Sequence, residues 1–346
     1  MINGHGNNIQ EYGAKIQLDF SSNIAFNHKA ELILNHLKDS LHLIVNYPDP
    51  NAKELTQLIA AHHGVSAPHI LVTNGSAEAF YLIAHLFQNV NTAICIPAFA
   101  EYEDACKLYN HRLHFHPLSE FSLETYSAYN TVWLGNPNNP DGSFISRSVI
   151  DDHCMNSPHT HFIVDEAYAH LCNPLSLSTQ GHLHKNLITV HSLTKAFAIP
   201  GLRLGYIVAH PSLISRLSEM RPPWSVNALA LEAGTYIMNH YNSLYPAIDE
   251  LQNESVFLQQ ELSQIKGMKV IESSCNFFLC ELEFMSAALC KRILIEQYGI
   301  LIRDVSNFRG LGESHFRVSA QSRSENLKLI EALRVVLSAA EREIIL

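Results

Sequence analysis

Between about Asp49 and Arg221, short apolar runs alternate with stretches of helical periodicity. This alternation is typical of βαβ units, in which parallel strands form one sheet and helices pack on its faces. The sequence therefore predicts an α/β fold built on a mostly parallel sheet.

Five of the apolar runs end in a polar motif. They are 70–72 before Thr73-Asn74-Gly75-Ser76, 93–96 before Pro97-Ala98-Phe99, 131–134 before Gly135 to Gly142, 162–164 before Asp165 to Tyr168, and 187–190 before Ser192 to Lys195. Ligands of open parallel sheets bind at the carboxyl ends of the strands. We therefore expect the five motifs to converge on one site.

The pattern changes after Pro246. Apolar residues at helical spacing then predict one long helix with Gly267 as its C-cap; they are Ile248, Leu251, Leu258, Leu262 and Ile265. Strands are expected around 268–271, 276–282 and 315–319, followed by a final helix from about Ser324. We assign residues 28–240 to a large domain, and residues 1–27 and 241–346 to a small α+β domain with an amino-terminal arm.

The composition is that of a globular chain with a sizeable core, because 47% of the 346 residues are hydrophobic and 16% are charged. The 23 Lys and Arg against 33 Asp and Glu give a net charge of −10, which disfavours broad contact with nucleic acid or an anionic membrane. The chain has no signal-like start, and no apolar run near the roughly 18 residues of a membrane span. We expect a cytoplasmic protein without nucleic-acid or membrane partners.

The cysteines and histidines form neither a disulfide framework nor a metal-binding pattern. Seven Cys, an odd number without a CxxC pair, indicate free thiols in a reducing compartment. Three histidine pairs have the spacing His-x-His; they are His114 and His116, His159 and His161, and His182 and His184. None has an accompanying Cys or acidic cluster, so we expect no metal site.

Lys195 and Asp165 follow buried strands and together indicate pyridoxal 5′-phosphate chemistry. Lys195 is preceded by the hydroxyls of Ser192 and Thr194, which can bind a phosphate without adding charge. A lysine that forms a Schiff base needs a desolvated position close to its cofactor, although this lysine taken alone also fits a solvated loop. Asp165 ends another apolar run, where a lone carboxylate is costly unless it is paired, and a pyridinium nitrogen is a known partner.

Other motif residues suit the remaining parts of this cofactor. Asn74-Gly75-Ser76 opens a helix whose N–H groups and dipole favour an anion, and Arg203 can add a bidentate contact. Asn139 and Tyr168 offer donors for the phenolic oxygen of the ring, and Phe99 offers an aromatic face. Taken singly, Arg203 also fits a surface ion pair, Gly75 an ordinary turn and Phe99 the core.

The ordered motifs resemble the fold type I pyridoxal phosphate enzymes of the aspartate aminotransferase fold, and the histidinol-phosphate aminotransferase branch of class I/II is similar. The motifs are Asn74-Gly75-Ser76, 97–102, Asn138-Asn139-Pro140, 165–168, 192–195 and 201–205. The resemblance spans nearly the whole chain. It implies a large cofactor-binding domain with a mostly parallel, seven-stranded sheet flanked by helices, and a smaller α+β domain.

The resemblance also implies roles for single residues. Lys195 would bind the cofactor covalently, Asp165 would pair with the pyridine nitrogen, and these two residues with Tyr168 would be catalytic. The implied cofactor-binding residues are Tyr47, Asn74, Gly75, Ser76, Phe99, Asn139, Asp165, Tyr168, Ser192, Thr194, Lys195 and Arg203. Tyr47 matches a tyrosine that reaches the phosphate from the other subunit, so a homodimer is implied.

Four further segments resemble the threonine-phosphate decarboxylases. They are His5-Gly6-Asn7-Asn8, 18–24, 223–230 and 300–304. This resemblance implies decarboxylation of a small amino-phosphate substrate, L-threonine O-3-phosphate, to aminopropanol phosphate in cobalamin biosynthesis. The implied substrate-binding residues are His5, Asn7, Asn8, Asn23, Arg303 and Arg317. Two alternatives remain: an aminotransferase acting on histidinol phosphate or an amino acid, and a non-catalytic pyridoxal phosphate protein.

Overall fold

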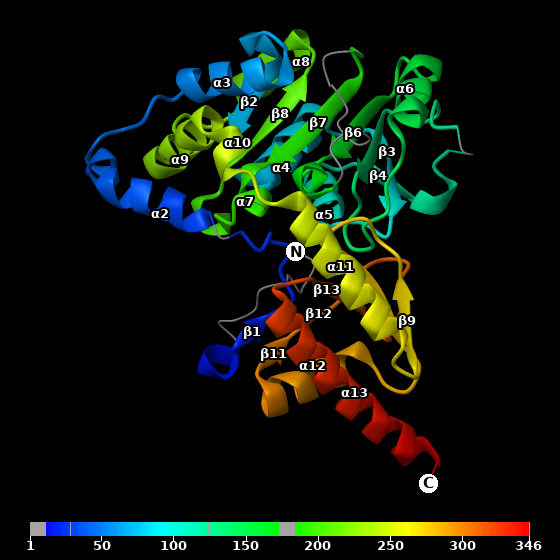
Figure 1. The fold of residues 1–346 in the computed structure, drawn as a ribbon. Helices are drawn as coiled ribbons and strands as arrows, with labels where there is room; N and C mark the ends of the chain where they lie inside the picture. The colour runs from blue at the N-terminus through cyan, green and yellow to red at the C-terminus, as the bar shows by residue number, and fades with distance from the viewer. Residues whose placement is uncertain (1–11, 28, 123–124, 173–183, 346) are drawn as a thin grey trace.

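The fold is that of a computed structural model, which describes residues 12–27, 29–122, 125–172 and 184–345. A seven-stranded sheet has the strand order β2-β8-β7-β6-β5-β3-β4 (Figure 1). Its strands are β2 (Ile70–Thr73), β3 (Asn91–Ile96), β4 (Arg112–Pro117), β5 (Thr131–Gly135), β6 (His161–Asp165), β7 (Leu187–Ser192) and β8 (Gly205–Ala209). Strand β8 runs antiparallel to β2 and β7, while the other neighbours are parallel. The predicted α/β class with a mostly parallel sheet is confirmed.

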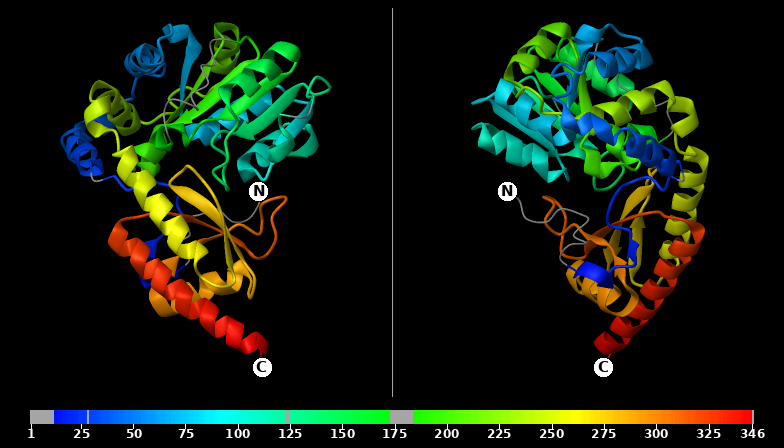
Figure 2. Two further views of the ribbon diagram at one scale, coloured as in Figure 1. Left: turned by 45° about the vertical axis from the view of Figure 1, so that its right-hand side comes forward. Right: turned by 90° about the vertical axis from the view of Figure 1, so that its left-hand side faces the viewer.

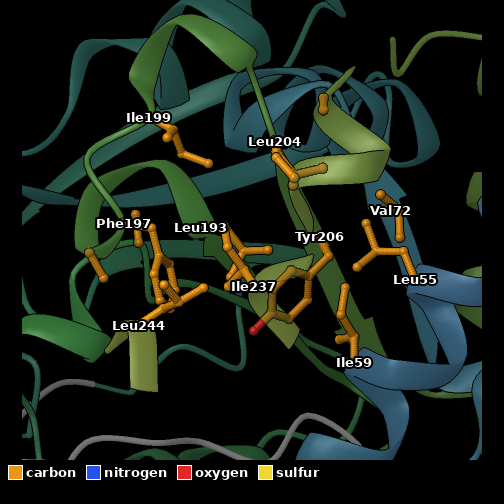
Figure 3. Packing of buried hydrophobic residues seen from close by; sticks show 14 of the residues in the cluster. Leu55, Ile59, Val72, Leu193, Phe197, Ile199, Leu204, Tyr206, Ile237 and Leu244 are labelled. Carbon is orange, nitrogen blue, oxygen red and sulfur yellow. The ribbon is translucent and has the colours of Figure 1, made fainter. Parts of the chain in front are cut away.

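Helices cover both faces of this sheet. Helices α4 (Gly75–Leu86), α5 (Ala100–Leu108) and α8 (Pro211–Met220) pack on one face, and α3 (Lys53–His63), α6 (Arg147–Asn156) and α9 (Ala228–Asn239) on the other. Phe162 and Val164 pack with α6, whereas Ile163 between them packs with α4 and α5. Figure 3 shows the core beside β8, where Tyr206 lies among residues of α3 and α9. Because both faces are covered, the central strands β5, β6 and β7 are almost entirely buried.

The remaining short elements connect these layers. They are the helices α2 (Ala30–Asp39), α7 (Leu193–Ala196) and α10 (Tyr241–Leu244), the 3₁₀ turns Gly13–Lys15, Leu41–Val45, Ala67–His69, Leu118–Glu120, Ala169–Leu171 and Pro200–Leu202, and the π turn Leu294–Tyr298.

The carboxyl-terminal part forms a second, antiparallel sheet of four strands in the order β12-β13-β10-β9. Its strands are β9 (Met268–Ile271), β10 (Phe277–Leu282), β12 (Arg303–Asp304) and β13 (His315–Ser319), and a separate parallel pair joins β1 (Leu18–Asp19) to β11 (Ile300–Leu301). Helices α11 (Ile248–Ser263), α12 (Ala287–Ile293) and α13 (Arg323–Ile345) share a core with this sheet. Helices α11 and α13 lie side by side (Figure 2), where Arg334 donates to Glu261 at 2.7 Å.

Two strands of the large sheet have no counterpart among the predicted apolar runs, and neither do the two-residue strands β1, β11 and β12. Strand β4 forms the edge of the large sheet, and its residues alternate between exposed and half-buried, so its sequence is not a continuous apolar run. Strand β8 begins at the last residue of the 201–205 motif, so no separate apolar run marks where the strand starts. The predicted domain boundaries stay a prediction.

The long helix after Pro246 is confirmed as α11, but the expectation that Gly267 is its C-cap is wrong. The helix ends at Ser263 and is capped by Gln264. Gly267 lies in the turn before β9 with a φ of +80°, and a side chain there would collide with Phe284. Glycine is favoured both at helix C-caps and in turns with a positive φ, so the sequence alone does not distinguish the two at Gly267.

Within the described residues, no helix combines the length and the apolar character that crossing a bilayer needs. Over those same ranges, no three His, Cys, Asp or Glu side chains gather in an arrangement that could hold a metal ion. All seven Cys are buried and none is in a disulfide.

Two histidines of the large part each have a buried ring nitrogen without a hydrogen-bond partner among the described residues. His191, in β7, stacks on Tyr206 with ring centres 4.7 Å apart, and its Nδ1 has no hydrogen-bond partner among the described residues. His170 shares a hydrogen bond with the Tyr241 hydroxyl at 2.9 Å, while its buried Nε2 has no partner in the described ranges. Burial lowers the pKa of His170 to about 4 and the pKa of His191 well below its usual range. Both imidazoles are therefore neutral in the folded protein at pH 7.

We expect the folded protein to lose stability as the pH falls from 6.5 towards 4. An unfolded histidine titrates near pH 6.5, so below that pH the unfolded chain binds protons that the folded chain does not. His170 alone should lower the free energy of unfolding by about 2 kcal/mol between pH 7 and pH 5. Urea unfolding at the two pH values measures this loss. It should shrink in His170→Gln but not in His42→Gln, at an exposed site, and an unchanged loss in His170→Gln would contradict the prediction.

Candidate active site

A pocket of about 440 Å³ lies between the two sheets, at the carboxyl ends of the parallel strands. Its lining includes Ser21 to Ile24 of the amino-terminal segment, Phe99, Asn139, Tyr168, Lys195 and Arg203 of the large part, and Arg303, Phe308 and Arg317 of the small part. The strand-end motifs therefore converge on one place, as the sequence predicts.

Lys195 reaches the pocket from α7, directly after β7 ends at Ser192. Its backbone carbonyl accepts a hydrogen bond from the Ala25 amide at 3.0 Å, so the amino-terminal segment passes along this turn. The Nζ atom lies 5.8 Å from the ring centre of Tyr168. Lys195 is half-buried, whereas Ser192 and Thr194 are buried and their hydroxyls share a hydrogen bond at 2.8 Å. A half-buried lysine amine that lines a pocket is suited to forming a Schiff base with an aldehyde.

Gly205 allows Ser76 and Ser192, two of the predicted phosphate-binding residues, to lie close together. In β8 it pairs with Thr73 of β2 on one side and with Ser192 of β7 on the other. A Cβ at Gly205 would lie 2.8 Å from the Ser76 amide nitrogen and 2.7 Å from the His191 carbonyl oxygen, so only glycine fits. The start of α4 is thereby held close to Ser192.

Gly75 and Arg203 complete this corner of the site. Gly75 has a φ of +77°, and a side chain there would collide with the Arg203 guanidinium, whose Nη1 donates to the Pro200 carbonyl at 3.0 Å. The N–H groups at the start of α4, the Ser192 hydroxyl and the guanidinium together suit a dianion such as phosphate. The side chain of Asn74 does not cap α4. The backbone N–H of Asn74 donates to the Glu78 carboxylate at 2.6 Å.

Asp165 lies at the carboxyl end of β6 and is 6% exposed. Its Oδ1 accepts a hydrogen bond from the Ala167 amide at 3.0 Å, and its Oδ2 accepts one from the Tyr102 hydroxyl at 2.6 Å. Burial raises the pKa of Asp165 to about 6, although these two hydrogen bonds and the charge of Lys195 oppose the rise. A carboxylate in this environment gains from a cation placed directly against it, and a protonated pyridine nitrogen is such a cation.

Arg303 and Arg317 stand directly opposite each other on the antiparallel strands β12 and β13, and both are buried. Arg317 donates from Nη1 to Asn139 Oδ1 at 2.5 Å and from Nη2 to the Ser21 carbonyl at 2.6 Å. Its Nε has no hydrogen-bond partner among the described residues. Burial lowers the pKa of Arg317 to about 10, and the charge of Arg303 adds to this effect. The pair therefore favours an anionic ligand.

Asn23 and Tyr168 add polar groups to the same pocket. Asn23 is 2% exposed, and neither atom of its amide has a hydrogen-bond partner in the part of the chain that the structure describes. Buried amides are almost always satisfied, so a ligand in the pocket is the natural partner. The ring of Tyr168 packs edge-on against Phe277, with ring centres 4.8 Å apart, which holds its hydroxyl in place.

The predicted site residues fall into three groups. Those that line the pocket are Asn23, Phe99, Asn139, Tyr168, Lys195, Arg203, Arg303 and Arg317, and those that lie in the elements adjoining it are Asn74, Gly75, Ser76, Asp165, Ser192 and Thr194. Tyr47 does not line this pocket; it is 84% exposed and packs against Trp224, with ring centres 5.1 Å apart. His5, Asn7 and Asn8 lie outside the described residues.

Phe308 and Tyr102 take part in the site although the sequence analysis assigned them no role. Phe308 lies in the loop between β12 and β13, with its ring centre 5.8 Å from the Arg303 guanidinium. No periodicity or motif marks this loop residue. Tyr102 lies in the first turn of α5, three residues after Phe99, which is the N-cap residue of that helix, and this short spacing in the 97–102 motif is the signal that could have found it.

Comparison with known proteins agrees with this geometry. Residues 15–333 match the family model described as aminotransferase class I and II. The chain is 32% identical to the threonine-phosphate decarboxylase of Salmonella typhimurium over 96% of each chain. It is also 32% identical to a histidinol-phosphate aminotransferase of Caldanaerobacter subterraneus over 86% of each chain. The crystal structure of L-threonine-O-3-phosphate decarboxylase from Porphyromonas gingivalis has a TM-score of 0.88 at 37% identity, covering 93% of this chain and 99% of that chain.

The chain therefore belongs to the class I and II aminotransferase family, and it is a pyridoxal phosphate-dependent enzyme. The residues of the pocket fit this cofactor. The corner formed by Ser76, Ser192 and Arg203 suits its phosphate, Asp165 suits its pyridine nitrogen, and Lys195 suits its aldehyde.

We expect Gly205→Ala to weaken pyridoxal phosphate binding about tenfold or more. The added methyl would displace the Ser76 amide, and losing a charge-assisted hydrogen bond has an effect of this size. Equilibrium dialysis of the cofactor-free protein measures the affinity. Gly201→Ala is the matched control, because a Cβ there would meet nothing within 4 Å. Equal affinities in the two variants would mean that the phosphate lies elsewhere.

Proposed function

We propose that this enzyme converts L-threonine O-3-phosphate to aminopropanol phosphate and carbon dioxide. The observation that carries the proposal is the buried pair Arg303 and Arg317, directly opposite each other across β12 and β13. Like charges in this arrangement destabilise a sheet unless an anion compensates them. A phosphorylated amino acid supplies two anionic groups, a carboxylate and a phosphate, and so matches two arginines. The similarity to threonine-phosphate decarboxylases over nearly the whole chain also supports it.

The cofactor would be held by residues from several strand ends. Phe99 would stack on the pyridine ring, and Asn139 and Tyr168 would donate to its phenolic oxygen. Asn139 is suited to this because Arg317 occupies its Oδ1, which leaves Nδ2 to donate. Asn74, Gly75, Ser76, Ser192, Thr194 and Arg203 would surround the phosphate, Asp165 would bind the pyridine nitrogen, and Lys195 would bind the aldehyde.

The two arginines would decide which bond breaks. Bound pyridoxal phosphate acts as an electron sink for the substrate bond at Cα that stands perpendicular to the pyridine ring. Arg317 would hold the carboxylate and Arg303 the phosphate, and two fixed anchors prevent rotation of the carboxylate out of the perpendicular position. Lys195, which lines the pocket, would deliver a proton from Nζ to Cα once carbon dioxide has left. Asn23 would bind a polar group of the same substrate with its unpartnered amide.

Transamination is the second candidate, and the similarity to a histidinol-phosphate aminotransferase favours it. In that reaction the Cα–H bond would be the one aligned for cleavage, and Lys195 would remove its proton. The same residues would serve both reactions, because the two differ by a rotation about one bond of the bound substrate.

The decisive experiment gives the holoenzyme L-threonine O-3-phosphate without a keto acid and measures carbon dioxide and aminopropanol phosphate. We expect sustained release of both, and none from Lys195→Ala, which lacks the proton donor. If neither product forms, but histidinol phosphate with 2-oxoglutarate yields glutamate, the enzyme is an aminotransferase. Arg303→Ala should raise KM for the phosphorylated substrate more than for L-threonine. Arg323→Ala, at an exposed arginine paired with Glu254, is the control.

We also propose that the enzyme is a homodimer in which Tyr47 reaches the phosphate of the neighbouring active site. Apolar side chains are exposed around Tyr47; they are Ile44, Val45 and Trp224, with Val45 79% exposed. This patch borders a groove of about 550 Å³. A contiguous exposed apolar surface is typical of a subunit interface, and in a twofold dimer the same patch meets its own copy.

Sedimentation velocity tests the dimer. We expect Val45→Asp to produce monomers and to weaken cofactor binding, because a buried charge opposes the interface and removes Tyr47 from the neighbouring site. Val335→Asp, at a 54% exposed valine of α13, should leave both properties unchanged. A monomeric wild-type enzyme with full cofactor affinity would refute the shared site.

A further inference from the structure

Tyr102 makes a buried hydrogen bond that the chemistry described so far does not use. It lies in α5, near the helix end that carries Phe99, and is 1% exposed. Its hydroxyl donates to Asp165 Oδ2 at 2.6 Å. This bond joins a helix on one face of the sheet to the carboxyl end of a central strand, 63 residues away in sequence.

The surroundings of Tyr102 hold the hydroxyl at this carboxylate. The tyrosine ring packs against Phe80, Phe99 and Trp133, with ring centres 5.0, 5.9 and 6.0 Å away. Gly135 is the β5 residue in register with Asp165, and a Cβ there would lie 3.4 Å from the Tyr102 hydroxyl. The phenol therefore lies beside the β5 backbone as well as beside the carboxylate, and the aromatic cage restricts its movement.

Four influences decide whether the Asp165 carboxyl group is ionised. Burial favours the neutral acid, while the Ala167 amide, the Tyr102 hydroxyl and the charge of Lys195 favour the carboxylate. Burial and the Asp165 charge hold the pKa of Tyr102 well above its usual range, so this phenol keeps its proton and acts as a donor. Removing the hydroxyl would deprive the carboxylate of a short hydrogen bond in a poorly screened environment.

We propose that Tyr102 is a positioning residue that holds Asp165 ionised and oriented toward the pyridine nitrogen of the cofactor. The inference rests on the role proposed above for Asp165. Tyr102 acts through Asp165 and does not itself line the pocket. With the carboxylate kept charged, the pyridine nitrogen keeps its proton to a higher pH, which strengthens both cofactor binding and electron withdrawal.

The test is Tyr102→Phe, which removes one oxygen and keeps the ring in its cage. Holoenzyme reconstituted with cofactor labelled with ¹⁵N in the pyridine ring reports protonation of that nitrogen by NMR. We expect the nitrogen to lose its proton at a lower pH than in the wild type, and cofactor affinity to fall about tenfold. Both readouts are independent of turnover. The control is Tyr126→Phe, at another fully buried tyrosine, whose hydroxyl lies 3.9 Å from Cys95 Sγ.

Asp165→Asn separates this inference from the role on which it rests. If Asp165→Asn alters the ¹⁵N signal while Tyr102→Phe matches both the wild type and Tyr126→Phe, the role of Tyr102 is refuted. If Asp165→Asn leaves the signal unchanged, Asp165 does not bind the pyridine nitrogen, and both the site assignment and this inference fail. Thermal unfolding of the cofactor-free variants shows whether any loss of affinity reflects a damaged fold.

Discussion

The buried guanidinium of Arg317 joins the three parts of the chain that form the pocket. It belongs to β13 of the small sheet, donates to Asn139 beside the large sheet, and donates to the Ser21 carbonyl in the segment that crosses between them. Hydrogen bonds from a charged donor are strong in a buried environment, and a buried partner left unsatisfied is costly. This one cation therefore helps to set the placement of the two sheets, and with it the shape of the pocket.

The same region gathers buried charged groups close to one another. Arg303 faces Arg317 across two strands, and burial pushes Asp165 toward its neutral form. Such groups lower the stability of a protein unless a partner compensates them. The phosphorylated cofactor and the anionic substrate proposed above would supply compensating charges, so binding should stabilise the folded enzyme as well as position the reacting groups. The hydroxyl of Tyr102 donates to Asp165 from within the protein and favours its charged form.

Much of the fold and of the candidate site could be predicted because the relevant signals are local. A buried strand followed by a polar motif places Asp165 and Lys195 at strand ends, and parallel strands bring those ends together. Strand β4 was missed because an edge strand is half exposed and lacks a continuous apolar run. Gly267 was misassigned because glycine serves helix caps and turns equally well. Phe308 lies in a loop, where no periodicity marks a residue that faces a pocket.

The sequence by itself determined the α/β class and the order of the motifs, which follow from composition and from spacing within single elements. It indicated the cofactor chemistry through Lys195 and Asp165 and through the resemblance to a known family. Only the tertiary structure decided that Arg303 stands opposite Arg317, that Tyr102 binds Asp165, and that Tyr47 lies away from the pocket of its own chain. The physical reason is that contacts between distant residues depend on strand register and on how helices pack across a sheet. Those are properties of the assembled core and not of any local stretch of sequence.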